Sequence, residues 1–477
     1  MQIPIVGGAY LARSSNLNHQ RCVNLFAEKD ESGTGKNVAA LIGTPGLRLL
    51  ATLGGTGGLR ALWTPTTGDM IAVQGSSVYS VTSAWAATLL GTIGTTSGPV
   101  SIADNGLVAV IVDGSAQGWT VTLATSVLTQ ITDPDFYGSD RVDYLDDLFV
   151  FNRPGTGQFY ISGFGDTTFD GLDFATAEGS PDNIVSFIVD HRQLIIFGKQ
   201  SGEMFENTGN ASFPIERAGN VFIEQGCAAA FGIAKIDNTV FWLGSGKSGD
   251  GIIWRLDGAR PVRISTHAIE FAIQGYSTMA DCTAYAYQQE GHSFVVFNFP
   301  TAGATWVYDA STGLWHERAW LNPATGTLGR HRSNCHAFFA GLHVVGDWEN
   351  GKLYALDLDY FTDNGDPLPS IRAAAHISSG DYKRIRFDAL QIDFETGTGT
   401  QTGQGVDPQA MLDWSDDGGH TWSAQHWRDI GAVGRYKDRV RWKQLGQSRD
   451  RVYRVTITDP VKRVIISCSS EAKGLTS

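Results

Sequence analysis

The chain has 477 residues, too many for one ordinary domain, and its 42% apolar and 18% charged content is that of a globular protein with a large core. Its net charge of −13 argues against a protein whose main surface grips nucleic acid, because phosphate binding needs clustered Lys and Arg. Five widely spaced cysteines without a Cys-x-x-Cys pair argue against a disulfide framework and predict folding in a reducing cytoplasm. No signal peptide or membrane-spanning stretch is indicated.

Residues 51–362 repeat one unit: a short apolar strand, a turn rich in Gly, Asp or Ser, and a strand that carries aromatic residues. Seven copies have first strands that start at residues 70, 107, 148, 194, 240, 294 and 342. A drifting period of about 40–50 residues is typical of propeller blades, which stack around an axis because a single blade cannot bury both its faces. We therefore predict a six- or seven-bladed β-propeller, with one or two long β-sandwiches as the alternative.

Two segments within the repeats resemble chemical motifs. Gly-Ser-Gly-Lys-Ser at residues 244–248 suggests a phosphate-binding loop, but Phe241 replaces the required first Gly and a strand follows instead of a helix, so a hairpin turn is predicted. Residues 330–336 gather possible metal ligands, yet Cys335 and His336 point to opposite faces of a strand. Paired acids elsewhere stand at turns, where Asp is expected for backbone reasons. We predict no catalytic, cofactor or metal site, and no enzyme.

Residues 363–477 form a different unit. A turn-rich linker opens it, and strict alternation of apolar and polar residues at 390–395 and 453–458 predicts half-buried strands. This end is therefore expected to be a β-sandwich-like platform domain, which makes the whole chain all-β. Residues 1–50 lack the blade period and are expected to pack on the platform.

The platform contains one Asp-box, the pattern Ser-x-Asp-x-Gly-x-Thr-Trp. The carboxylate can accept turn N–H groups, Gly allows a positive φ, and Trp packs beneath the turn, so the motif staples a hairpin and marks no active site. A sialidase would need several such boxes and an arginine cluster for its substrate. The structural Asp-box residues are Ser415, Asp417, Gly419, Thr421 and Trp422.

A basic stretch follows the Asp-box. Residues 435–463 hold ten basic and three acidic side chains, and residues 379–477 carry a net charge of +2, which leaves −15 for residues 1–378. Alternation places Arg439, Arg441 and Lys443 on one strand face and Val440 and Trp442 on the other. The stretch is either a solvated strand face or an electrostatic docking surface for an acidic partner or passing DNA. Its candidate docking residues are Arg435, Lys437, Arg439, Arg441 and Lys443.

Short motifs at both ends of the chain resemble packaged-DNA stabilisation proteins, the tail hub or nozzle proteins of short-tailed bacteriophages. That family tends to have Asn-Leu-Tyr-Pro-Glu and then Thr-Pro-Gly-Leu near its start, and Phe26-Ala27 departs from the usual Tyr-Pro. The order of the motifs along the chain carries the resemblance more than any single one. They lie at residues 21–28, 43–47, 415–422, 434–436, 441–442, 445–450 and 459–461.

The resemblance implies a homohexameric tube below the portal and its adaptor ring, in which the two chain ends form a platform and the propeller projects outward. Such a virion protein would extend the DNA channel, retain the packaged genome and conduct it at ejection. It would be assembled in the host cytoplasm, touch viral double-stranded DNA transiently, and offer its propeller to tail fibres, spikes or a central plug, without membrane insertion. The alternatives are a glycan-binding or sialidase-like propeller and a monomeric receptor-binding module.

Overall fold

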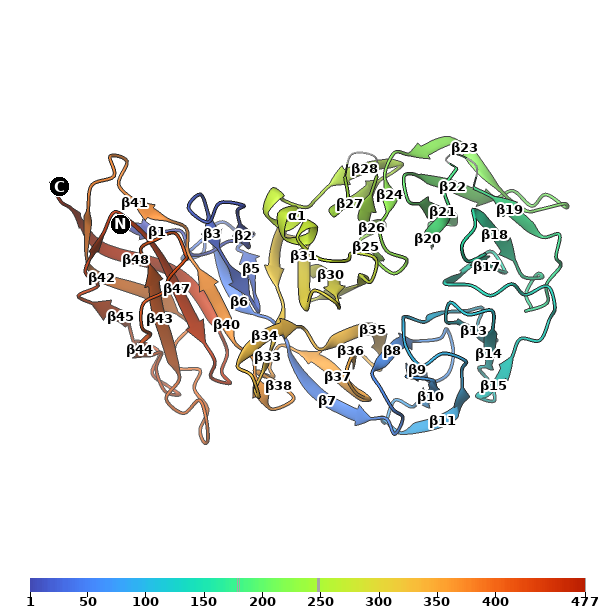
Figure 1. Cartoon of the computed structure of the whole chain (residues 1–477). Helices are drawn as coiled ribbons and strands as arrows, with labels where there is room; N and C mark the ends of the chain where they lie inside the picture. The colour runs from blue at the N-terminus through green and yellow to red at the C-terminus, as the bar shows by residue number, and fades with distance from the viewer. Residues whose placement is uncertain (178, 180, 247–248, 477) are drawn as a thin grey trace.

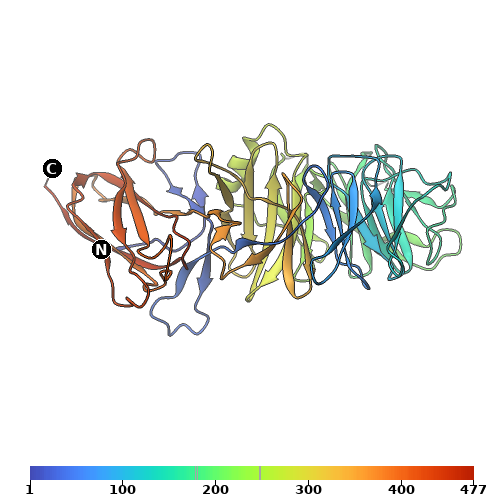
Figure 2. The ribbon, with the colours of Figure 1, turned by 90° about the horizontal axis from the view of Figure 1, so that it is seen from below.

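Short apolar strands joined by tight turns close into a ring in the computed structural model, which describes residues 1–177, 179, 181–246 and 249–476 (Figure 1). A second all-β body lies against the rim of the ring and contains both chain termini. When the ring is viewed edge-on, this second body extends roughly in the plane of the ring (Figure 2). The molecule is therefore elongated, with the termini at the end farthest from the ring.

Four antiparallel sheets of four strands make up the first part of the ring, each with its first strand nearest the axis. From the inner to the outer strand they are β8 (Leu59–Trp63), β9 (Met70–Gln74), β10 (Ser77–Val81) and β11 (Ala87–Thr92); β12 (Ser101–Asp104), β13 (Val108–Val112), β14 (Gly118–Thr122) and β15 (Val127–Gln130); β16 (Val142–Leu145), β17 (Leu148–Asn152), β18 (Gln158–Ile161) and β19 (Phe174–Thr176); and β20 (Ile184–Asp190), β21 (Gln193–Gly198), β22 (Gly202–Asn207) and β23 (Ile215–Ile223).

Three further sheets complete the ring. They are β25 (Ile233–Ile236), β26 (Thr239–Ser245), β27 (Ile252–Asp257) and β28 (Arg260–Arg263), with β24 (Gly226–Cys227) paired to β26; β29 (Thr283–Gln289), β30 (His292–Phe299), β31 (Ala304–Asp309) and β32 (Leu314–Glu317); and β35 (Ser333–Phe339), β36 (Leu342–Asp347), β37 (Lys352–Asp357) and β7 (Gly46–Thr52). Helix α1 (His267–Gln274) follows β28, and the hairpin of β33 (Ala319–Asn322) and β34 (Thr327–Arg330) separates the last two sheets.

The propeller prediction is confirmed: across the described residues the ring has seven blades. The seven hairpins expected from the sequence are the second and third strands of each blade. The outer strand of the last blade is β7, which arrives from the other end of the chain and pairs antiparallel with β37, Leu47 opposite Leu356. The first and last parts of the propeller are thereby joined, and β7 crosses the domain boundary expected at residue 50.

Strand β17 is buried along its whole length, and its two faces show why the blades stack. Leu148 and Val150 pack toward the next blade, in one core cluster with Phe205. Phe149 and Phe151 point the other way, in a cluster with Val110 of the preceding blade. A strand that is covered on both faces has no polar alternation, and this is the pattern that the sequence shows.

The second body is a β-sandwich, as predicted, built from both ends of the chain. One sheet has the order β45 (Val440–Lys443), β42 (Ile385–Phe394), β48 (Val464–Gly474), β6 (Ala39–Gly43) and β5 (Leu25–Lys29), with β1 (Gln2–Ile3) on β48 and β46 (Gln447–Ser448) on β42. The other has the order β4 (Cys22–Val23), β40 (Ser370–Ala373), β47 (Asp450–Ile457), β43 (Gln409–Ser415) and β44 (His426–Asp429), with β41 (Ile377–Ser378) on β47. The short pair β2 (Tyr10–Leu11) and β3 (His19–Gln20) stands beside them.

Sandwich and propeller share backbone pairing. Strand β4 pairs in parallel with β32 of the sixth blade, Val23 opposite Glu317, so one sheet runs from the ring into the sandwich. Strands β38 (Thr362–Asp363) and β39 (Asp366–Pro367) extend the seventh blade in the same region through β7. All five cysteines are free thiols. Among the described residues, no helix is long and apolar enough to cross a membrane.

Candidate functional site

The basic edge, which we define as Arg435, Lys437, Arg439, Arg441 and Lys443, lies on the sandwich at the end away from the propeller (Figure 1). Its C-terminal part is β45, an edge strand that pairs with β42. Val440 and Trp442 are buried in the sandwich core, which fixes the opposite face of the strand toward solvent. Residues 435–439 precede the strand in an exposed turn, so only Arg441 and Lys443 belong to it.

Some residues of the basic edge form ion pairs and the others do not. Arg441 pairs with Glu471 of β48 at 2.6 Å, and Arg435 has a looser contact of 3.7 Å with Asp438. Lys437, Arg439 and Lys443 are exposed and make no ion pair with any described residue. The charge that remains for a partner therefore resides mainly in these three side chains.

Two further basic residues on the same sheet were not identified from the sequence. Arg386 of β42 stands opposite Lys473 of β48, and both side chains are exposed beside the basic edge. Alternation within each strand gives their outward direction, but their position beside β45 depends on strand register, for which the sequence has no local signal. Arg386 pairs with Asp388 at 2.9 Å, so Lys473 adds the free charge.

The Asp-box forms the expected staple after β43. The Ser415 Oγ accepts the Gly419 N–H at 2.7 Å and donates to Asp417 Oδ1 at 2.7 Å. Asp417 accepts the backbone N–H of Thr421 at 2.9 Å and its hydroxyl at 2.6 Å. Hydrogen bonds from the Thr421 hydroxyl and then from its N–H hold the pKa of the Asp417 carboxyl far below its usual range, although the side chain is exposed.

Trp422 connects the Asp-box to two other segments. The guanidinium carbon of Arg454 lies 3.8 Å from the centre of the Trp422 ring, and the His19 ring lies 5.8 Å away. Arg454 is held by Asp413 through its Nε at 3.0 Å. The motif therefore joins β43, β47 and the N-terminal segment, and its carboxylate is fully engaged by the turn.

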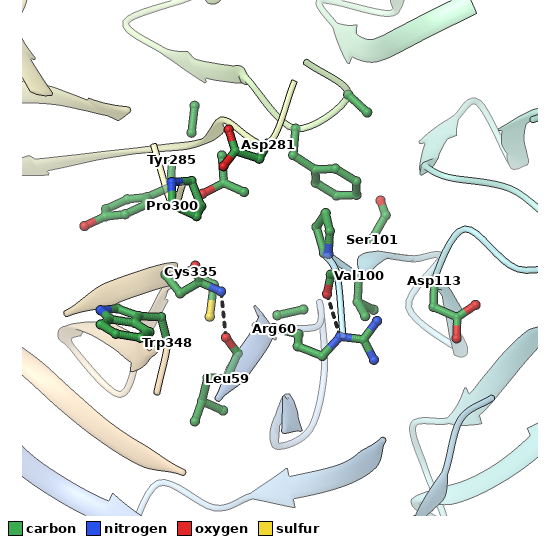
Figure 3. A pocket seen from close by; sticks show the side chains of 18 of the residues that line it. Leu59, Arg60, Val100, Ser101, Asp113, Asp281, Tyr285, Pro300, Cys335 and Trp348 are labelled. Atoms are coloured by element: carbon green, nitrogen blue, oxygen red, sulfur yellow. Dashed lines mark hydrogen bonds between the residues drawn. The ribbon is translucent and has the colours of Figure 1, made fainter. Parts of the chain in front are cut away.

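The inner strands of the propeller enclose an axial cavity of about 1100 Å³ (Figure 3). Arg60, Arg141, Arg330 and Lys235 contribute cationic groups, and the first two hydrogen-bond to backbone carbonyls. Arg60 donates to Gly98 O at 2.6 Å, Gly75 O at 2.8 Å, Thr95 O at 2.8 Å and Ser97 O at 2.7 Å. Arg141 donates to Ala230 O at 2.8 Å. These arginines fix loops between blades.

Burial shifts the pKa values of two cysteines and one histidine that line the cavity. Burial raises the pKa of the Cys335 thiol to about 12 and that of Cys282 well above its usual value. Burial also lowers the pKa of His336 to about 3, and its ring stacks on Tyr285 with centroids 5.5 Å apart. No cluster of three or more metal-ligating side chains occurs among the residues described.

A seven-bladed propeller together with a β-sandwich built from both chain ends defines a two-domain all-β protein. Residues 1–361 match the family model described as bacteriophage P22 Gp10, beta-propeller, and residues 371–473 match the one described as bacteriophage P22 Gp10, beta-sandwich. The chain therefore belongs to the bacteriophage P22 Gp10 family of tail proteins, and the resemblance to packaged-DNA stabilisation proteins of short-tailed phages is confirmed.

Two solved structures are similar to part of this chain. The WD40 beta propeller domain of Doa1 is 11% identical, with a TM-score of 0.42 over 65% of this chain and 96% of that one. The computationally designed Ika8 protein is 12% identical, with a TM-score of 0.38 over 65% of this chain and 99% of that one. No curated protein matches the sequence.

Proposed function

We propose that the protein is the nozzle subunit of a short-tailed phage: a non-catalytic homohexamer that extends the DNA channel below the portal–adaptor complex, retains the packaged genome and conducts it at ejection. The family assignment, which covers both bodies, is the observation that carries the proposal. The architecture supports it, because one sandwich gathers both chain ends and the ring extends away from it (Figure 2).

The sandwich is the part that we propose to dock on the portal–adaptor complex. Its basic edge lies at the far end from the ring and keeps three unpaired cations, Lys437, Arg439 and Lys443. A cationic edge that meets an acidic collar would steer assembly, and pressure from packaged DNA requires a broad, correctly oriented interface. Such steering weakens with salt, because the screening length falls from about 10 Å at 0.1 M to about 3 Å at 1 M.

The propeller is proposed to face tail fibres, spikes or a central plug. Residues 1–378 carry a net charge of −15, and an acidic surface along a conduit would not trap the phosphates of double-stranded DNA in transit. The contact with DNA would accordingly be transient. The protein would be assembled in the host cytoplasm and remain in the virion.

Charge reversal tests the docking proposal. The double variant Arg439→Glu, Lys443→Glu should fold and stay soluble, because both side chains are exposed, yet fail to join DNA-filled heads, which then leak their genomes. The matched control is Lys199→Glu, Arg260→Glu, two exposed residues of the propeller with the same change in net charge. Normal particles from the first variant would contradict the docking role and leave the basic edge as a solvated strand face.

Arg441 is tested separately because it already has a partner. Arg441→Glu should weaken assembly partly by disturbing Glu471, and the exchanged pair Arg441→Glu, Glu471→Arg should restore it if the ion pair is only structural. Electron microscopy of the purified chain gives the oligomeric state directly. A strict monomer in the virion would contradict the nozzle and favour a receptor-binding module.

A further inference from the structure

Four charged side chains meet inside the junction between propeller and sandwich. Arg318 follows β32 of the sixth blade, Arg332 precedes β35 of the seventh, Asp363 lies in β38, and Arg463 precedes β48 of the sandwich. Their exposed fractions are 1%, 8%, 0% and 2%, respectively. Charges this deeply buried are costly unless they are paired or hydrogen-bonded. Each polar atom of the cluster therefore needs a hydrogen-bond or ion-pair partner.

Each arginine uses only part of its donor set within the protein. Arg318 Nη2 donates to the Tyr287 hydroxyl at 2.5 Å, Arg332 Nε to Asp347 at 2.8 Å, Arg332 Nη2 to Glu349 at 3.0 Å, and Arg463 Nη1 to Leu368 O at 2.7 Å. Four buried donor atoms find no partner among the described residues: Arg318 Nε and Nη1, Arg332 Nη1 and Arg463 Nε. Neither carboxylate oxygen of Asp363 has a partner there either.

The arginine N–H groups and the Asp363 carboxylate interact electrostatically across the junction. All three arginines act electrostatically on the Asp363 carboxyl, although none forms an ion pair with it within 4.0 Å. Burial is the larger influence and raises the pKa of Asp363 to about 7, against the arginines, which lower it. A bridging group that donates to the carboxylate and accepts from the guanidinium groups would supply the missing hydrogen-bond partners on both sides.

The donor and acceptor atoms of the cluster indicate which bridging group fits. A bound anion would accept from the arginines, but it would repel Asp363 and leave both its oxygens without donors. A metal cation would be repelled by three guanidinium groups. Water donates two hydrogen bonds and accepts two, and buried waters typically serve otherwise unsatisfied polar groups in this way. Water alone matches four N–H donors and two carboxylate acceptors.

We propose that Arg318, Arg332, Arg463 and Asp363 bind a cluster of ordered water molecules that joins the propeller to the sandwich as a solvent-mediated ionic link. Asp363 is its anionic anchor, and Arg463 is the group that the sandwich contributes. The link fixes the angle between the two bodies at the point where the chain passes from one to the other. This inference does not depend on the nozzle function.

An experimental map at about 2 Å resolution tests the link directly. Water peaks are expected at hydrogen-bonding distance, about 2.7–3.2 Å, from both Asp363 oxygens and from the four free donor atoms. Direct contact of an arginine with Asp363, or an anion peak between the arginines, would overturn the proposal.

Thermal unfolding of the full chain supplies a second test. Asp363→Leu should lower Tm by about 3–5 °C, because it leaves the buried Arg318 and Arg463 without a nearby counter-charge. The double variant Asp363→Leu, Arg463→Leu should regain part of that loss, as coupled partners do in a mutant cycle. Asp359→Asn, an exposed carboxylate of the same linker, is the matched control and should leave Tm unchanged. Additive losses in the double variant would contradict the link.

Added anions distinguish a cluster that binds water from one that binds an anion. At constant ionic strength, replacing chloride by phosphate or by a large organic anion should not change the Tm of the wild-type protein. A stabilisation by one anion that disappears in Arg463→Leu would show that the arginines bind that anion, and the water-mediated link would be wrong.

Discussion

Asn24 and Ala319, 295 positions apart in the chain, exchange two hydrogen bonds in the buried junction. The Ala319 N–H donates to Asn24 Oδ1 at 2.9 Å, and Asn24 Nδ2 donates back to Ala319 O at 2.8 Å. The same Nδ2 donates to Pro369 O at 2.8 Å, so one amide joins the N-terminal segment, the β33–β34 hairpin and the entry to the sandwich. This contact gives the Asn of the Asn-Leu-Phe-Ala-Glu motif a physical role.

Asn24→Ala is therefore expected to destabilise the junction. Buried backbone groups of Ala319 and Pro369 would lose their partners, at about 1–3 kcal/mol each, and Ala is also less favourable than Asn at the φ of 52° found here. Chemical denaturation measures the loss. Asn364→Ala is the matched control, since Asn364 has a φ of 53° and its side chain makes no hydrogen bond in the described structure, so its loss should be confined to the backbone part. Equal losses would mean that the Asn24 amide is unimportant.

Gly46 of the Thr-Pro-Gly-Leu motif tests the closure of the ring. A Cβ at this position would stand 2.6 Å from Thr362 O and still closer to Tyr360 O, both backbone atoms beside β7. Gly46→Ala should push β7 away from β38 and lower the free energy of unfolding by about 1–3 kcal/mol or more, because backbone cannot yield as a side chain does.

Gly54→Ala provides the control for Gly46→Ala, because a Cβ at Gly54 meets nothing within 4 Å. Its unfolding midpoint should stay close to that of the wild type. If both variants unfolded alike, the close approach of the chain at Gly46 would have no energetic consequence.

The Asp-box is expected to stabilise the sandwich in a pH-dependent way. The pKa of Asp417 is depressed by the Thr421 hydroxyl and N–H, so its contribution is present above the carboxyl pKa of the unfolded chain, about 4, and is lost as the pH falls below that value. Asp417→Ala should lower the denaturation midpoint slightly at pH 7 and have a smaller effect at pH 3. Thr421→Val, which keeps the backbone N–H, should give an intermediate loss at pH 7, and a difference that grew toward acid would contradict this account.

Buried histidines should make the protein sensitive to acid. Burial, together with Arg318, lowers the pKa of His331 to about 3, from an ordinary value of 6.5. The folded protein binds fewer protons than the unfolded chain between these values, so stability falls as the pH drops, by about 1.4 kcal/mol per pH unit for one group. His331→Gln should reduce this slope by that amount between pH 6 and 4. Denaturation series at several pH values measure the slope of the wild type and of the variant, and equal slopes would contradict this account.

Local patterns along the sequence determined the class of fold. Seven hairpins with strands apolar on both faces were enough to predict blades, because a strand covered on both sides needs no polar alternation. The Asp-box fixed its own turn, since all its hydrogen bonds lie within residues 415–421. The burial of Val440 and Trp442 behind the basic edge followed from period two alone. These features depend on neighbours a few residues away, and such neighbours are visible in sequence.

The tertiary structure alone decided the features that join distant segments. The pairing of β7 with β37 completes the seventh blade, and the pairing of Arg441 with Glu471 leaves other cations of the basic edge free. The predicted hairpin turn at 244–248 includes residues 247 and 248, which lie outside the described residues. The junction cluster had no local signal at all, because Arg318, Asp363 and Arg463 are ordinary surface residue types until the fold buries them together. Contacts between residues hundreds of positions apart depend on register and closure of the whole chain, and these are set by packing and not by local propensity.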